Sequence, residues 1–259
     1  MIRILAAGDV VTHLTDYELL GPYFTAHHFL MLVVSGLMIL AFGAIAKAAA
    51  SRPGRTGWVA LAEVGLVWVR DEIVYPWLGE KKGRQYVAFF WTLFFWILLS
   101  NLLGMFPFPI NPWHRTATGN ISVTAALAII AFVVIQVSGM KQHGYVKYWV
   151  HLVPGGVPLL LWPLVWVIEF IGLFTKPFAL TVRLFANMTA GHAILAVLFG
   201  FLMGIGHFSS AAIGGAASVA SFAFILFIML FETLVALIQA YIFTVLTAIF
   251  VSLAVAEEH

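Results

Sequence analysis

Five long apolar runs alternate with short polar stretches along this chain. The runs cover residues 29–46, 87–106, 121–138, 159–206 and 219–255. A helix crosses a bilayer when it offers roughly 20 mostly apolar residues, with about 17 as the lower limit. The pattern therefore predicts an all-α, polytopic membrane protein with five membrane helices.

The last two runs are too long for one upright crossing each. At about 1.5 Å per residue, residues 159–206 and 219–255 both exceed a hydrocarbon core of about 30 Å. Each run is therefore either two spans or one strongly tilted or bent helix. No obvious break divides residues 219–255, so we favour the single tilted helix.

Residues 56–84 have a different pattern. Glu63 and Arg70 lie seven positions apart and so share one helix face. Three tryptophans flank this polar stripe, namely Trp58, Trp68 and Trp77. The pattern predicts an amphipathic helix that lies in the membrane interface. A partly buried linker helix between two spans is the alternative.

The composition agrees with a membrane protein and excludes several other classes. Hydrophobic residues make up 63% of the chain and charged residues 9%, against roughly 25% charged residues in soluble domains. A net charge of +2 does not suggest nucleic acid. The absence of cysteine excludes disulfides and thiolate metal sites. No Walker, Rossmann or HExxH motif is present, so we expect no bound nucleotide, cofactor or metal.

The basic residues orient the chain in the membrane. Five crossings plus an interfacial helix bring three basic clusters to one side: Lys47, Arg52 and Arg55; Lys81, Lys82 and Arg84; Lys141 and Lys147. Loops rich in Lys and Arg stay in the cytoplasm. The same count places the C-terminus on that side, so the sequence predicts a cytoplasmic C-terminus.

Arg183 is the only formal charge in the apolar stretch 178–205. A guanidinium does not lose its charge at any relevant pH. At the centre of a bilayer it costs from about 3 to more than 10 kcal/mol. Such a residue indicates an ion pathway, or a counter-ion for an anionic group.

Further polar residues form stripes on the last two apolar segments. The first stripe, at helical spacing, is Glu169, Lys176, Arg183 and Asn187, and the second is Glu232 and Gln239. Two such stripes on neighbouring helices suggest a hydrated path. The alternative is that they bond to each other and hold the bundle together. Lys176 alone is better explained as a side chain that reaches back to the interface.

The polar groups differ in what they can do chemically. Glu232 and His192 can take up and release protons when buried or paired, whereas Arg183 stays charged. A lone His on an apolar helix is usually a packing residue, but here it accompanies other polar groups. This division suits a proton path that must not leak.

Three segments resemble one family. TKPFALTVRLFANMTAGH, residues 175–192, closely resembles the central signature of subunit a of F-type ATP synthases. Residues 231–259, which begin FETLVALIQAYIF, are similar to its C-terminal segment, and SNLLGMFPF, residues 100–108, to its preceding hairpin. The resemblance spans residues 87–259. The first eighty residues are compatible in hydropathy only.

The resemblance implies a single membrane domain, residues 1–259, with an N-terminal span and interfacial helix in residues 1–84 and a proton-channel region in residues 85–259. Its last two helices would form a long tilted hairpin against a ring of c subunits. The chain would be non-catalytic and would lie in the bacterial plasma (inner) membrane. Its partners would be the c ring, b-type peripheral stalk subunits and the remaining ATP synthase subunits.

The resemblance also implies roles for single residues. Arg183 would face the ring carboxylate, with Gln239 packed near it, and Glu169 would belong to the cytoplasmic half-channel. The opposite half-channel would contain Asn187, His192 and Glu232. Some relatives carry Glu and His at these last two positions in exchanged order, which predicts that the two side chains are neighbours.

Two other functions stay open at this point. A secondary transporter or antiporter would use Arg183 to hold an anionic substrate, and it predicts inverted repeats and helices broken at the midplane. A purely structural bundle predicts that Arg183 tolerates replacement.

Overall fold

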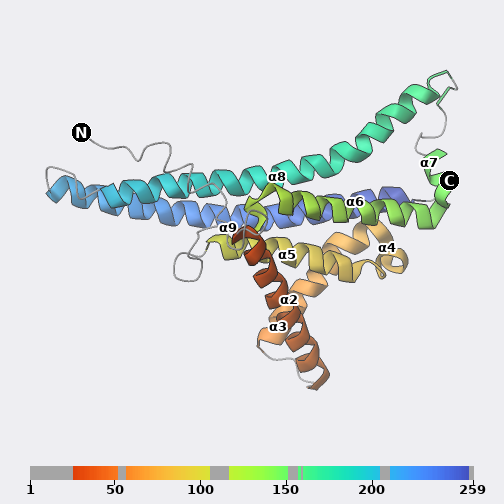
Figure 1. Cartoon of the computed structure of the whole chain (residues 1–259). Coiled ribbons are helices and arrows are strands. Elements are labelled where there is room, and N and C mark those ends of the chain that lie inside the picture. Colours follow the sequence, from red (N-terminus) through yellow and green to blue (C-terminus); the bar gives the residue numbers. More distant parts are fainter. Residues whose placement is uncertain are drawn as a thin grey trace. The chain divides into compact units, whose positions relative to one another are not determined.

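Helices make up the regular structure of the described residues, which are 26–51, 57–105, 117–150, 157–158, 160–204 and 211–256 of a computed structural model (Figure 1). In chain order the elements are α2 (Ala26–Ser51), α3 (Trp58–Trp68), the π-helix η1 (Val69–Val74), α4 (Tyr75–Gly83), α5 (Val87–Met105), the 3-10 helix η2 (Ala117–Gly119), α6 (Ile121–His143), α7 (Tyr145–Val150), α8 (Trp162–Gly204) and α9 (Ala211–Val255).

Five of these helices are long and apolar enough to cross a membrane. The candidate spans are His28–Ala48, Val87–Gly104, Ile121–His143, Trp162–Gly191 and Val219–Val255. Each overlaps one of the five apolar runs of the sequence. The prediction of an all-α, multi-pass membrane protein is confirmed.

The two longest runs are single helices. α8 has 43 residues and α9 has 45, without an interruption in either. At about 1.5 Å per residue they extend about 65 Å and 68 Å. A second crossing would require the chain to reverse its direction within the run. A continuous helix does not reverse direction, so each run crosses once at most. α9 begins at Ala211, eight residues before the predicted run, because the small residues there continue the helix. Their tilt in a membrane stays a prediction.

The described residues fall into two compact units. The first lies within Met1–Gly36, Ile97–Val123 and Leu184–Gln239, and the second within Leu37–Trp96, Thr124–Arg183 and Ala240–His259. α8 and α9 therefore each contribute to both. We describe each unit by itself, and the predicted single domain of residues 1–259 stays a prediction.

The predicted interfacial helix is divided into three segments in the second unit. α3 passes into the π-helix η1, and α4 contains a kink at Gly79, whose φ of 68° lies in the left-handed region that favours glycine. Val69, Ile73 and Val74 of this π turn are fully buried. This burial anchors the segment to its unit. Whether it lies in the membrane interface stays a prediction.

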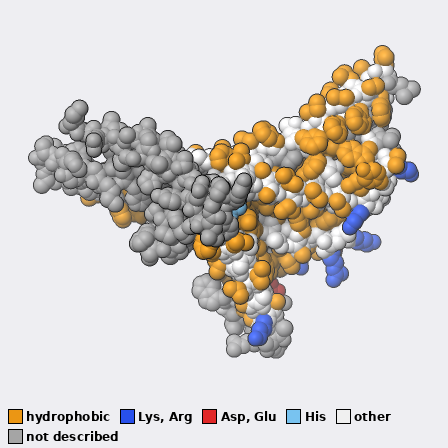
Figure 2. Space-filling model, in the orientation of Figure 1, with side chains coloured by type: hydrophobic (Ala, Val, Ile, Leu, Met, Phe, Trp, Pro, Cys, Tyr) orange, Lys and Arg blue, Asp and Glu red, His pale blue; other side chains and the backbone are white. Residues whose placement is uncertain are grey.

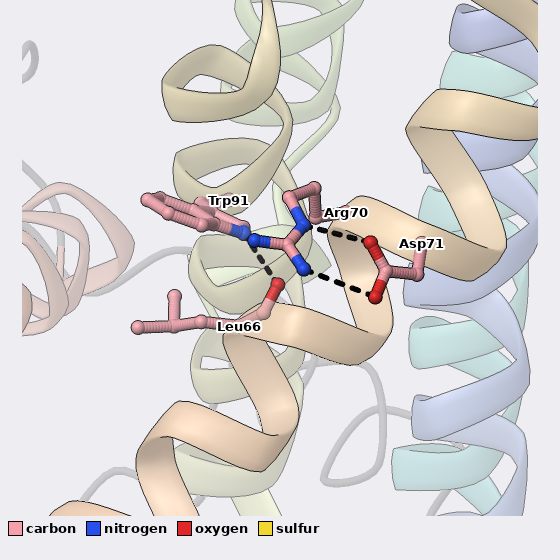
Figure 3. A network of polar contacts seen from close by, with 4 residues as sticks. All are labelled: Leu66, Arg70, Asp71 and Trp91. Carbon is pink, nitrogen blue, oxygen red and sulfur yellow. Dashed lines mark hydrogen bonds and ion pairs between the residues drawn. The ribbon is translucent and has the colours of Figure 1, made fainter. Parts of the chain in front are cut away.

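The polar residues of η1 remain at its surface. Arg70 Nε lies 2.7 Å from Asp71 Oδ1 and Arg70 Nη2 3.1 Å from Asp71 Oδ2 (Figure 3). This hydrogen-bonded pair lowers the pKa of Asp71. Both side chains are more than one-third exposed, so the pair adds little stability. Beside it, Trp91 Nε1 donates to the Leu66 carbonyl at 2.7 Å and joins α5 to α3.

Hydrophobic side chains predominate on much of the described surface in Figure 2. Ile39, Leu40 and Leu230 are each more than 70% exposed. A soluble monomer rarely exposes large contiguous apolar patches, whereas lipid tails match such a surface. The outer faces of the spans therefore suit a bilayer.

Candidate functional site

Buried polar groups gather on the parts of α8 and α9 that belong to the first unit. Three of the predicted site residues are described there with their side chains, namely Asn187, Glu232 and Gln239. Glu232 and Gln239 are only 5% and 4% exposed. The apolar residues Leu184, Met188 and Ala236 on the same stretches of α8 and α9 are almost fully buried as well.

The Glu232 carboxyl lies directly against the backbone of α8. A Cβ atom added to Gly191 would be 2.9 Å from Glu232 Cδ and 3.5 Å from Cγ, with Oε1 nearer still. Real Cβ atoms do not approach other atoms so closely. The carboxyl therefore occupies the space that any other residue at position 191 would fill. α8 and α9 meet here without an intervening side chain.

Asn187 and Gln239 extend this contact along the two helices. Asn187 precedes Gly191 by four residues and so shares its face of α8, and Gln239 follows Glu232 by seven on α9. Four side-chain atoms of these residues are buried without a hydrogen-bond partner among the described residues: Asn187 Nδ2, Gln239 Nε2 and both carboxylate oxygens of Glu232.

Such groups are costly unless something bonds to them. A buried polar group without a partner costs about 1–3 kcal/mol, and more if it is charged. Buried polar atoms in proteins are nearly always bonded to protein or to ordered water. An acid and two amides that are buried along two facing helices offer hydrogen-bonding groups that water could satisfy, and the acid is the one group among them that can take up and release a proton.

His192 follows Gly191 on α8, and its side chain lies outside the described residues. The structure brings the neighbouring backbone to Glu232. The predicted contact between the His192 and Glu232 side chains stays a prediction.

Arg183 is exposed on the surface of α8, in the second unit. Its neighbour Val182 is 39% exposed, while Leu184 on the other side is fully buried. No ion pair joins Arg183 to any acidic residue that the structure describes. Within the described part of the chain the guanidinium is therefore exposed and forms no ion pair. Gln239 belongs to the other unit, so its predicted packing near Arg183 stays a prediction.

Glu169 lies half-buried on α8, also in the second unit. Its carboxylate turns along its own helix toward Gly172, where an added Cβ would be 4.0 Å from Oε2. That distance is an ordinary contact, unlike the close approach at Gly191. The side chain of Lys176 lies outside the described residues.

The sequence analysis missed two features of the first unit. One is the role of Gly191, whose only signal was a small residue within the polar signature. The other is a hydrogen bond of 2.7 Å in which Thr118 Oγ1 donates to Asn101 Oδ1, with both residues fully buried. Asn101 Nδ2 and Ser100 Oγ beside it have no partner among the described residues. No periodic pattern links η2 to the end of α5, so the pair was not predictable.

The fold and these groups define a class, the multi-pass helical membrane proteins with ionisable groups inside their spans. Comparison with known proteins is more specific. The family described as ATP synthase A chain matches residues 29–252. The chain belongs to this family, and the resemblance found in three segments is confirmed over most of the chain.

Individual relatives agree. The chain is 45% identical to ATP synthase subunit a of Myxococcus xanthus over 199 residues, which are 77% of this chain and 61% of the relative. It is 40% identical to that of Chloroherpeton thalassium, over 96% of this chain and 72% of the relative. It is also 40% identical to ATP synthase subunit a 2 of Prosthecochloris aestuarii, over 98% of this chain and 81% of the relative. The chain thus spans less than two thirds of the Myxococcus relative. The secondary-transporter alternative finds no support in these comparisons.

Proposed function

We propose that the chain is the proton-translocating stator subunit of an ATP synthase Fo motor. It would provide two aqueous half-channels and an arginine that faces the carboxylates of a c-subunit ring. The observation that carries this proposal is Arg183, a permanent cation exposed on an apolar membrane helix of an ATP synthase A chain. A charge in that position needs an anionic partner.

The half-channel from the outside is formed by Asn187, His192 and Glu232. Support comes from the buried atoms of Asn187 and Glu232 on facing helices, which have no hydrogen-bond partner among the residues that the structure describes. A carboxyl or imidazole there can hold a proton, and the Asn187 amide can orient water beside it. A proton that passes this way neutralises a ring carboxylate, which can then enter lipid.

The second half-channel leads to the cytoplasm past Glu169. After rotation the ring carboxylate ionises there. Arg183 attracts the anionic carboxylate and repels protons, so it prevents direct leakage between the half-channels, and Gln239 packs near it. One proton that crosses 100 mV yields about 2.3 kcal/mol, so several are needed for each nucleotide. The chain is not catalytic itself, and nucleotide chemistry belongs to other subunits.

The partners follow from the same role. They are the c ring, b-type peripheral stalk subunits and the remaining ATP synthase subunits. The chain lies in the bacterial plasma (inner) membrane with its C-terminus in the cytoplasm. The basic residues Lys81, Lys82, Lys141 and Lys147 support that orientation, because cytoplasmic ends of spans are rich in Lys.

The test is replacement of Arg183 in the assembled complex. Arg183→Ala and Arg183→Gln should abolish ATP-driven proton pumping in reconstituted vesicles while the complex still assembles. Arg183→Lys should pump more slowly than the unmodified protein, because an ammonium can lose its proton and lacks the planar fork of a guanidinium. Arg84→Gln, which removes an exposed cation outside the spans, is the matched control and should pump normally. Normal pumping by Arg183→Ala would refute the proposal.

A further inference from the structure

The turn between α6 and α7, residues 140–148, carries basic and apolar side chains together. Lys141, Tyr145, Val146 and Lys147 are all exposed, Tyr145 by 71% and Val146 by 73%. The span that precedes this turn, Ile121–His143, has 23 residues. At about 1.5 Å per residue it is slightly longer than the hydrocarbon core, so a helix that crosses the core would bring the turn to headgroup level.

The turn is held in one conformation from the side of α6. Gly144 has a φ of 84° and ends the helix, and its N–H donates to the Met140 carbonyl at 2.9 Å. Tyr148 folds back over Gly139, where an added Cβ would be 2.8 Å from Cδ2 of the ring. Its hydroxyl donates to Gln136 Oε1 at 2.7 Å. Burial raises the pKa of Tyr148, so the phenol remains a donor at neutral pH.

The turn is also held from the side of α8. Trp166 Nε1 donates a hydrogen bond to the Trp149 carbonyl at 3.0 Å. The ring centroids of Trp149 and Phe170 lie 6.2 Å apart. The Trp166 and Phe170 rings are stacked, with their centroids 5.1 Å apart. Tryptophans are typical of the headgroup level of membranes. The backbone that carries the basic side chains is therefore already ordered, so only the side chains lose freedom when a ligand binds.

The charge of this region has one sign. Lys141, His143 and Lys147 lie within seven residues of each other, and the sequence has no acidic residue between Glu80 and Glu169. Neither lysine has an ion-pair partner within the described ranges. Exposed cations beside exposed apolar groups match the two parts of an anionic phospholipid.

We propose that the α6–α7 turn binds the headgroup of an anionic phospholipid, with Lys141 and Lys147 on its phosphate and Tyr145 and Val146 among its upper acyl carbons. This site does not depend on proton transport. The lipid would fix the cytoplasmic ends of α6 and α8 at one depth in the bilayer.

The test uses the intact complex in nanodiscs of phosphatidylcholine and phosphatidylglycerol, with a photoactivatable phosphatidylglycerol as probe. Mass spectrometry should find the label on the turn, residues 140–148. Each lysine beside an anionic lipid raises the binding constant for that lipid about fivefold. Labelling should therefore fall about fivefold in Lys141→Gln or Lys147→Gln, and further in the double variant. Inorganic phosphate should not compete.

The matched control is Lys81→Gln with Arg84→Gln, which removes two exposed cations that lie close to Glu80 and should leave labelling of the turn unchanged. A phosphatidylcholine probe should label all variants equally. Three results would overturn the proposal: unchanged labelling in both single lysine variants, competition by inorganic phosphate, or capture of a protein subunit in place of lipid by a photo-crosslinker at position 145.

Discussion

Gly191→Ala is the sharpest test of the site in the first unit. The substitution adds one methyl group at the point where α8 meets the Glu232 carboxyl. The methyl carbon would be 2.9 Å from Cδ and closer to Oε1, which is well inside van der Waals contact. Because Glu232 is only 5% exposed, its carboxyl has no open solvent to move into and must adopt another rotamer.

Two opposing effects set the size of the change. Alanine is better than glycine inside a helix by about 1 kcal/mol. Overpacking of a tight contact costs about 1–3 kcal/mol. The stability of the complex should therefore change by no more than about 2 kcal/mol, and the complex should assemble. Transport should suffer more, because displacement of a reacting group by about 1 Å can lower a rate about a hundredfold.

The assay is ATP-driven acidification of reconstituted vesicles. Gly191→Ala should lower its rate between tenfold and a hundredfold. Gly172→Ala is the matched control: it makes the same change on the same helix beside Glu169, but its added Cβ would be 4.0 Å from the carboxylate. It should pump normally. Aspartate has a shorter side chain that leaves room for the added methyl group. The double variant Gly191→Ala with Glu232→Asp should therefore pump faster than Gly191→Ala alone. Equal rates in Gly191→Ala and the unmodified protein would refute the reasoning.

Three further predictions concern other contacts. His192→Glu combined with Glu232→His should recover more pumping than either change alone, and additive losses in this double-mutant cycle would contradict direct coupling. Thr118→Val should destabilise the complex by about 1–3 kcal/mol in thermal unfolding, because it leaves the buried Asn101 carbonyl without its donor; Thr92→Val on the exposed face of α5 is its control. Cysteines introduced singly along α8 and α9 of this cysteine-free chain should show one membrane crossing for each helix, with accessible positions inside it only on the face of the half-channels, and two complete crossings within either helix would disprove the prediction.

Long apolar runs determined the membrane helices, because a helix that crosses a membrane needs such a run whatever its neighbours are. All five spans were predictable for this reason, and so was the continuity of α8 and α9. The boundaries were less certain. α9 begins earlier than predicted because its first turns contain small residues that are compatible with either a loop or a helix. The π turn at Val69–Val74 had no signal, since inserting one residue into a helix leaves the composition unchanged.

The sequence also determined which residues are chemically unusual in a membrane, because charges such as Arg183, Glu169 and Glu232 are costly in an apolar helix wherever it packs. Only the tertiary structure decided what surrounds them. Gly191 matters because it has no Cβ atom, which leaves room for the Glu232 carboxyl. Which residue uses that room depends on the helix that packs against position 191. Likewise, Thr118 finds Asn101 across a connection that no local pattern describes. Contacts between distant segments depend on how whole helices pack, and a single sequence does not contain that geometry in any local pattern.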